Sequence, residues 1–356
     1  MSGRLAKGFG YSVIVAAVAA SPAAAQFGGV IHRDTVPAPS LRHNLVGDLP
    51  ARPMSVYLPP SYSSHPERRY PVLYFLHGFD ADDRALIKGG YQNLNIRISM
   101  DSLVRSRKAR EMIIVMPSAR NAYDGSFYTN SPVTGRWEDF VARDLVRYVD
   151  RKYRTIRDRK ARGIAGHSMG GYGALYVGMR HPETFSAVYS LSAYGLGFDV
   201  SPSDPAYKRI WQTVLSLSSR DELDKAGFHA QLLVARAAAR SPNRTNPPFY
   251  VDLPYRYAGD SLIPVTLVTS RWRVTPLTMA GYYVRNLRRL RIGFDAGGQD
   301  AFPDIPVRAR ELDSTLTVLR VRHEFEEYLG AHGNRIRQRM EQRVLPFFSR
   351  YLTRAR

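Results

Sequence analysis

Short apolar runs alternate with amphipathic segments along most of this chain. The runs at 70–76, 111–117 and 185–191 are dominated by apolar residues, which is typical of strands buried on both faces of a parallel sheet. Residues 137–153 place apolar side chains at helical spacing between two such runs. Strands that alternate with helices predict an α/β fold, in which helices flank a mostly parallel central sheet.

The same alternation extends toward both ends of the chain. Residues 54–58 alternate as a strand that ends before two prolines. Near the C-terminus, strands are predicted over 290–294 and 320–328, and helices over 306–318 and 334–352. We therefore expect the sheet to be completed by segments far apart in the chain.

The segment 197–273 interrupts this alternation of strands and helices. A helix is predicted over 206–217, and a capping box at 219–222 precedes a second helix that is expected to run to about residue 238. A loop rich in proline and asparagine follows at 241–248. We interpret the segment as a helical, cap-like insertion over the functional site, with a plain surface insertion as the alternative.

The N-terminal segment has the pattern of a secretory signal peptide. Arg4 and Lys7 precede a short apolar stretch at 11–20, and the small residues at 21–25 suit cleavage before Gln26. The apolar stretch is too short to span a bilayer comfortably. The pattern therefore predicts export, to the periplasm or the medium of a bacterium.

Export also suggests the domain boundaries. We expect residues 1–25 to be removed, residues 26–40 to form an exposed lead-in interrupted by prolines, and residues 41–356 to form a single domain. No later stretch reaches about 18 apolar residues. We therefore expect no stable membrane insertion.

Composition narrows the chemistry. The 356 residues contain no cysteine, which excludes thiol catalysis and cysteine-ligated metals, and no tight His/Glu cluster suggests zinc. We predict neither a metal nor another cofactor. The net charge is +20, with 51 Lys and Arg against 31 Asp and Glu. Because the cations are scattered and export is predicted, we expect no nucleic-acid partner; the oligomeric state stays open.

The most informative motif is Gly166-His167-Ser168-Met169-Gly170. It follows a predicted strand at 161–165 and precedes a helix of small residues. A G-x-S-x-G pentapeptide between strand and helix is the nucleophile elbow of α/β-hydrolases, where a sharp turn exposes the serine hydroxyl. We therefore assign Ser168 as the candidate nucleophile.

A serine nucleophile needs a base and an acid, which follow it in this order: acid, then histidine. His323 lies inside a predicted strand, whereas His332 lies in a loop after that strand, so we assign His332 as the base. For the acid, Asp300 lies on a loop past the strand at 290–294 and is our choice. Asp304, farther along that loop, is the alternative.

Two backbone N–H groups are expected to hold an oxyanion. One belongs to Met169, at the start of the elbow helix, and the other to Phe79, in the His77-Gly78-Phe79 loop. We interpret His77 as structural.

Aromatic residues past the central strands are candidates for the substrate pocket. We name Tyr128, Trp137 and Tyr194, although core packing is about equally compatible with each position.

Several segments of the chain resemble the esterase D, feruloyl esterase and antigen 85 group of α/β-hydrolases, which also includes S-formylglutathione hydrolases. The resemblance extends over roughly 40–195 and 285–352. It is carried by the segments 70–79, 166–175, 181–185 and 325–332.

The resemblance implies an α/β-hydrolase fold and hydrolysis of carboxylic esters, with Ser168, His332 and Asp300 as the triad. It departs from many relatives after the histidine, where Gly333-Asn334 stand in place of Asp and Trp. Small-molecule or polysaccharide-linked esters would be the substrates. An acyltransferase acting on a sugar or lipid hydroxyl uses the same triad and stays open, and a non-catalytic basic surface-binding protein is the remote alternative.

Overall fold

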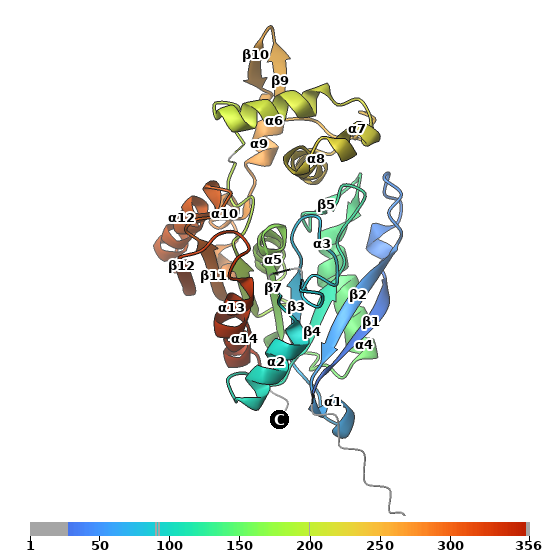
Figure 1. Ribbon diagram of the computed structural model, residues 1–356, viewed down its shortest axis with the longest axis vertical. Coiled ribbons are helices and arrows are strands. Elements are labelled where there is room, and N and C mark those ends of the chain that lie inside the picture. Colours follow the sequence, from blue (N-terminus) through green and yellow to red (C-terminus); the bar gives the residue numbers. More distant parts are fainter. Residues whose placement is uncertain (1–27, 90, 92, 199, 354–356) are drawn as a thin grey trace, which may run out of the picture.

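A computed structural model describes residues 28–89, 91, 93–198 and 200–353. An eight-stranded sheet lies at its centre, in the order β1-β2-β4-β3-β7-β8-β11-β12 (Figure 1). Its strands are β1 (Val30–Pro37), β2 (Ala51–Leu58), β3 (Val72–Leu76), β4 (Ile113–Pro117), β7 (Arg162–His167), β8 (Ala187–Leu191), β11 (Arg291–Gly297) and β12 (His323–Tyr328). The predicted signal peptide, 1–25, lies outside the described residues.

The strand directions follow the predicted α/β class. All neighbours from β4 across to β12 are parallel, whereas β1 and β2 join the sheet antiparallel. Every residue of β3, β4, β7 and β8 is buried, because helices cover both faces of a parallel sheet. This is an α/β-hydrolase fold with a mostly parallel sheet.

Two apolar cores lie on the two faces of the sheet. One contains side chains of α5 (Met169–Arg180) and α12 (Asp304–Val318), together with Trp137 and Phe140. The other contains side chains of α2 (Ile96–Arg105) and of residues 336–351, which we call the C-terminal helical segment. The sheet is therefore the middle layer of three.

Two predicted helices each contain a π-helical turn. The helix expected over 137–153 consists of α3 (Trp137–Asp139), η2 (Phe140–Leu145) and α4 (Val146–Lys152). The closing helix consists of α13 (Ile336–Arg339), η4 (Met340–Val344) and α14 (Leu345–Tyr351). The remaining short elements are η1 (Pro39–Leu41), α1 (Ser61–Ser64), β5 (Asn130–Ser131), β6 (Gly135–Arg136), η3 (Arg159–Ala161), α10 (Pro276–Met279) and α11 (Val284–Leu287).

In the segment 26–40, expected as an exposed lead-in, most of the described residues are exposed or half-buried, but residues 30–37 form an edge strand of the sheet and do not merely precede it. All eight residues of β1 pair with β2, from Val30 opposite Leu58 to Pro37 opposite Ala51. An edge strand pairs on one side only, so it tolerates the polar residues and the proline that made this segment read as exposed.

The insertion at 197–273 forms a separate layer at the top of the view in Figure 1. It contains α6 (Pro205–Ser216), α7 (Arg220–Lys225), α8 (Phe228–Arg240), the hairpin β9 (Tyr255–Ala258) and β10 (Ser261–Pro264), and α9 (Thr266–Trp272). We call these elements the cap.

One predicted helix of the cap is two helices. The helix expected from the capping box to about residue 238 is broken between α7 and α8 at Gly227, whose φ is +84°. Glycine adopts this conformation without the steric cost that other residues meet. Within the described ranges, no helix combines the length and the apolar run needed to cross a membrane.

Candidate active site

Ser168 lies on the turn between β7 and α5. Its φ of 58° and ψ of −119° are unusual for a residue with a side chain, and such strain is characteristic of functional turns. Its backbone N–H donates to the Leu191 carbonyl (2.9 Å), and its carbonyl accepts from the N–H groups of Tyr172 (3.0 Å) and Tyr194 (3.2 Å). The turn is therefore held from three sides.

Glycine at both ends of the pentapeptide allows this turn to pack closely. A Cβ on Gly170 would lie 2.0 Å from the Leu76 carbonyl oxygen, and one on Gly166 would lie 2.3 Å from the Gly170 oxygen. Both positions are therefore closed to any larger residue. The pentapeptide glycines bring α5 down onto the end of β3.

His332 and Asp300 are hydrogen-bonded to each other. The His332 Nδ1–H donates to the Asp300 Oδ2 over 2.8 Å, and the Asp300 Oδ1 accepts the backbone N–H of Phe302 over 2.9 Å. The Asp300 side chain is fully buried, while that of His332 is 20% exposed. Asp304, the sequence alternative, is the first residue of α12. Of the two candidate acids, Asp300 is therefore the one hydrogen-bonded to the His332 imidazole.

His167, a neighbour of Ser168 in the chain, ties the His332 loop to the elbow. Its Nε2–H donates to the backbone carbonyl of His332 over 2.8 Å, and the two imidazole rings lie 4.7 Å apart. Burial lowers the pKa of His167 well below its usual value, so the ring stays neutral. Sequence analysis did not assign this role, although the residue lies inside the motif.

The loop after β3 lies against the elbow. A Cβ on Gly78 would be 3.5 Å from the Cβ of Ser168. The His77 Nε2 accepts the N–H of Ala119 (2.8 Å), so its Nδ1–H donates to the Gly78 carbonyl (2.7 Å). Burial lowers the pKa of His77 to about 4. His77 is thus neutral and structural in this geometry.

The two backbone donors named from the sequence flank this contact. Phe79 follows Gly78 in the loop, and Met169 is the first residue of α5. Within the described ranges, neither N–H has an acceptor in the protein. Both are therefore available to a ligand atom beside Ser168.

Two of the three expected pocket aromatics belong to the interior. Trp137 is fully buried, and its Nε1–H donates to the Thr134 carbonyl over 2.8 Å. Tyr128 is fully buried and donates to the His77 carbonyl over 2.8 Å, which supports the loop after β3. Both pocket assignments are wrong for this geometry, because position past a strand does not determine whether a ring turns inward.

Tyr194, the third, is also buried, at 2% exposure, but it lies beside the site. Its backbone contacts Ser168, and its ring lies 5.2 Å from that of Phe302. Phe302 in turn packs edge-on against His332 at 5.2 Å. Sequence analysis missed Phe302, which follows Asp300 by two residues.

Sequence analysis also missed the contribution of the cap. Phe228, the first residue of α8, lies 5.3 Å from the ring of Phe79 and 6.4 Å from that of Phe302. We call Phe79, Phe228 and Phe302 the aromatic row. It joins the loop after β3, the cap and the loop after β11.

His323, the other histidine late in the chain, is bonded to a different carboxylate. The Nε2 of His323, in β12, bonds to Asp313 over 2.9 Å. Across the described part of the chain, no group of three His, Asp or Glu residues is placed to hold a metal ion.

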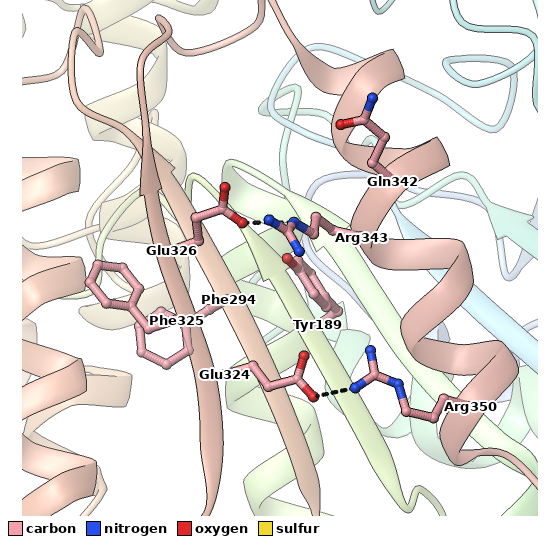
Figure 2. Close-up of a pocket in the computed structure, with 8 residues that line it drawn as sticks. All are labelled: Tyr189, Phe294, Glu324, Phe325, Glu326, Gln342, Arg343 and Arg350. Carbon is pink, nitrogen blue, oxygen red and sulfur yellow. Dashed lines mark hydrogen bonds and ion pairs between the residues drawn. The ribbon is translucent and has the colours of Figure 1, made fainter.

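A hollow of about 320 Å³ opens between β12 and the C-terminal helical segment (Figure 2). Its charges are paired: Arg343 with Glu326 at 2.8 Å, and Arg350 with Glu324 at 3.3 Å. Its lining includes neither Ser168 nor His332. The candidate site is thus distinct from this hollow.

A comparison with protein families decides the relationship. The family described as "Putative esterase" matches residues 51–336. The chain belongs to this esterase family. The match contains the elbow, Asp300 and His332, and it also spans the cap.

Curated relatives are similar over parts of their length. A Mycobacterium tuberculosis esterase is 32% identical over 146 residues, which are 39% of this chain and 28% of that protein. An endo-1,4-beta-xylanase/feruloyl esterase of Xylanibacter ruminicola is 28% identical over 52% of this chain and 26% of its own length. An S-formylglutathione hydrolase of Arabidopsis thaliana is 29% identical over 38% and 49%, respectively. The chain spans about half or less of each of these proteins.

Solved structures match over most of the chain. A ferulic acid esterase gives a TM-score of 0.63 at 25% identity, over 92% of this chain and 100% of the other. An S-formylglutathione hydrolase from Staphylococcus aureus gives 0.56 at 16% identity, over 91% and 99%. These likenesses support the α/β-hydrolase fold.

Proposed function

We propose that the protein is an exported serine hydrolase that cleaves carboxylic esters through a covalent acyl-enzyme. The single observation that carries the proposal is the hydrogen bond between His332 and Asp300, on a loop that His167 ties to the Ser168 turn. Membership of the esterase family supports it independently.

Each group in this geometry suits one step of acyl transfer. His332 takes the Ser168 proton as the oxygen attacks the ester carbonyl, and it then protonates the departing alcohol. Asp300 receives the Nδ1–H, which leaves the Nε2 free to act as the base. Water, deprotonated by His332, then attacks the acyl-enzyme, which releases the acid and restores Ser168.

The backbone donors suit the tetrahedral intermediate. The N–H groups of Phe79 and Met169 would hold its oxyanion, with the free N–H groups at the start of α5 adding a favourable dipole. Small-molecule or polysaccharide-linked esters are the substrates of this proposal.

The proposal is tested at Ser168. In Ser168→Ala, hydrolysis of p-nitrophenyl acetate should fall to background, since no residue would remain to form the acyl-enzyme. A fluorophosphonate probe should label the unaltered protein and not the variant. Circular dichroism provides the control for folding. Retained hydrolysis in a folded Ser168→Ala protein would refute the assignment.

Export is tested separately. The charged, apolar and small-residue pattern of 1–25 supports cleavage before Gln26. Mass spectrometry of protein from the periplasm or medium of a bacterial host should give an N-terminus at Gln26. An intact Met1 on cytoplasmic protein alone would contradict export.

A further inference from the structure

We infer that Phe228 and Phe302 form the binding site for the leaving alcohol of the ester, and that this site favours an aryl alcohol. The inference rests on the proposed function, because it places a substrate group beside the proposed base. It concerns the alcohol side of the ester, which neither the family nor the catalytic groups determine.

Phe302 lies beside the proposed base. Its ring packs edge-on against His332 at 5.2 Å, with an angle of 69° between the planes. His332 donates the proton that releases the alcohol, so the alcohol oxygen must come within a hydrogen bond of this imidazole. A group attached to that oxygen therefore lies close to Phe302.

The position of Phe302 is coupled to the acid. Its backbone N–H donates to the Asp300 Oδ1 over 2.9 Å, and its ring is backed by Tyr194 at 5.2 Å. A side chain held at both its backbone and its ring presents a rigid wall, and rigid walls bind with little loss of conformational entropy. The wall and the catalytic imidazole are thus fixed by the same loop.

Phe228 brings the cap to the same place. It begins α8 and remains 44% exposed although its ring contacts Phe79 and Phe302. His229, also exposed, adds a ring 5.7 Å from Phe302. An apolar side chain that keeps nearly half its surface open, beside the proposed catalytic groups, has apolar area left for a ligand to cover.

The aromatic side chains beside the proposed base favour one class of leaving alcohol. The contact between Phe79 and Phe228 is edge-to-face, at 88° between the planes, an arrangement that a further aromatic ring extends favourably. Phenyl rings provide no hydrogen-bond partner for hydroxyl groups, which would lose hydration against them. An aryl group therefore fits this row better than a short alkyl or polyol group. Of the two substrate classes proposed above, the inference thus favours small-molecule esters over esters of a polysaccharide hydroxyl.

The test varies the alcohol at a fixed acyl group. In Phe228→Ala, kcat/KM for 2-naphthyl acetate should fall on the order of tenfold more than kcat/KM for ethyl acetate, mainly through KM. Comparing variant with wild type for each ester cancels the different reactivities of the two leaving groups. Leu267→Ala, at an exposed leucine of α9 in the cap, is the matched control and should change neither value.

A second series varies the acyl group at a fixed alcohol. The ratio of kcat/KM for p-nitrophenyl acetate and p-nitrophenyl butyrate should be the same in Phe228→Ala and wild type. A changed ratio would place Phe228 on the acyl side and overturn the inference. An equal loss on naphthyl and ethyl acetate would overturn it as well.

Binding without turnover separates this inference from the proposed function. Free 2-naphthol, followed by its fluorescence, should bind folded Ser168→Ala protein and bind it about tenfold more weakly when Phe228→Ala or Phe302→Leu is added. Equal naphthol binding with and without these changes would refute the alcohol site even if Ser168 is the nucleophile. Hydrolysis by Ser168→Ala would refute the nucleophile while leaving the naphthol measurement intact.

Discussion

The sheet and the cap approach the candidate site by different means. The sheet presents Ser168, the Gly78–Phe79 loop and Asp300 from the ends of β7, β3 and β11, held largely by backbone hydrogen bonds. The cap approaches it through two exposed side chains, Phe228 and His229, at the start of a helix. If the proposals above are correct, reactivity depends on groups that the sheet holds through its backbone, whereas selectivity depends on a few aromatic side chains that can be exchanged.

The largest expected effect tests the sheet side. Asp300→Asn should lower kcat on p-nitrophenyl acetate by about 10⁴-fold, because an amide can stabilise the wrong tautomer of His332. Steady-state kinetics measures the loss. Asp304→Asn is the matched control, since Asp304 begins α12, and it should keep near-wild-type kcat. A larger loss in Asp304→Asn would reverse the choice of acid.

The next effect tests how the buried loop after β3 depends on pH. Because burial lowers the pKa of His77 from 6.5 to about 4, the unfolded state binds more protons than the folded state between these values. Stability should therefore fall as the pH drops from 6.5 to 4, by up to about 3 kcal/mol from this residue. Urea unfolding across this pH range measures it.

The matched comparison for that pH effect is His77→Asn. The amide can still offer a donor and an acceptor in the loop but does not titrate. The variant should be less stable at pH 7 and should lose less stability on acidification than the wild type. An identical pH slope in both proteins would show that His77 is not the cause.

A smaller effect tests the tie between His167 and the His332 loop. His167→Phe keeps a ring but removes the N–H that reaches the His332 carbonyl. We expect kcat to fall about tenfold with KM little changed, because the base would be less well oriented. His323→Gln, in β12 away from the site, should leave kcat unchanged. An equal loss in both variants would indicate a general structural effect.

The smallest effect tests the cap. Gly227→Ala forces a side chain into a backbone conformation with a φ of +84°, and should lower the free energy of unfolding by about 1 kcal/mol. Nothing lies within 4 Å of the added Cβ, so the cost is conformational and not a clash. Thermal unfolding measures it. An unchanged midpoint would contradict a conformational cost at Gly227.

Prediction from sequence was closest where periodicity and burial agree. The apolar runs of β3, β4 and β8 are buried on both faces and are found within two residues of their predicted starts. Prediction failed at β1, where an edge strand carries polar residues. It also failed at Gly227, where a single residue splits a helix.

The sequence by itself determined the order of the candidate groups and the fold that can use it. The pentapeptide around Ser168, followed in the chain by Asp300 and His332, indicates an α/β-hydrolase because chain order is a property of that fold. Only the tertiary structure showed that Asp300 is hydrogen-bonded to His332, that Trp137 is buried, and that Phe228 lies against Phe79. The physical reason is that side-chain direction and contacts between distant segments depend on packing, which local periodicity does not encode.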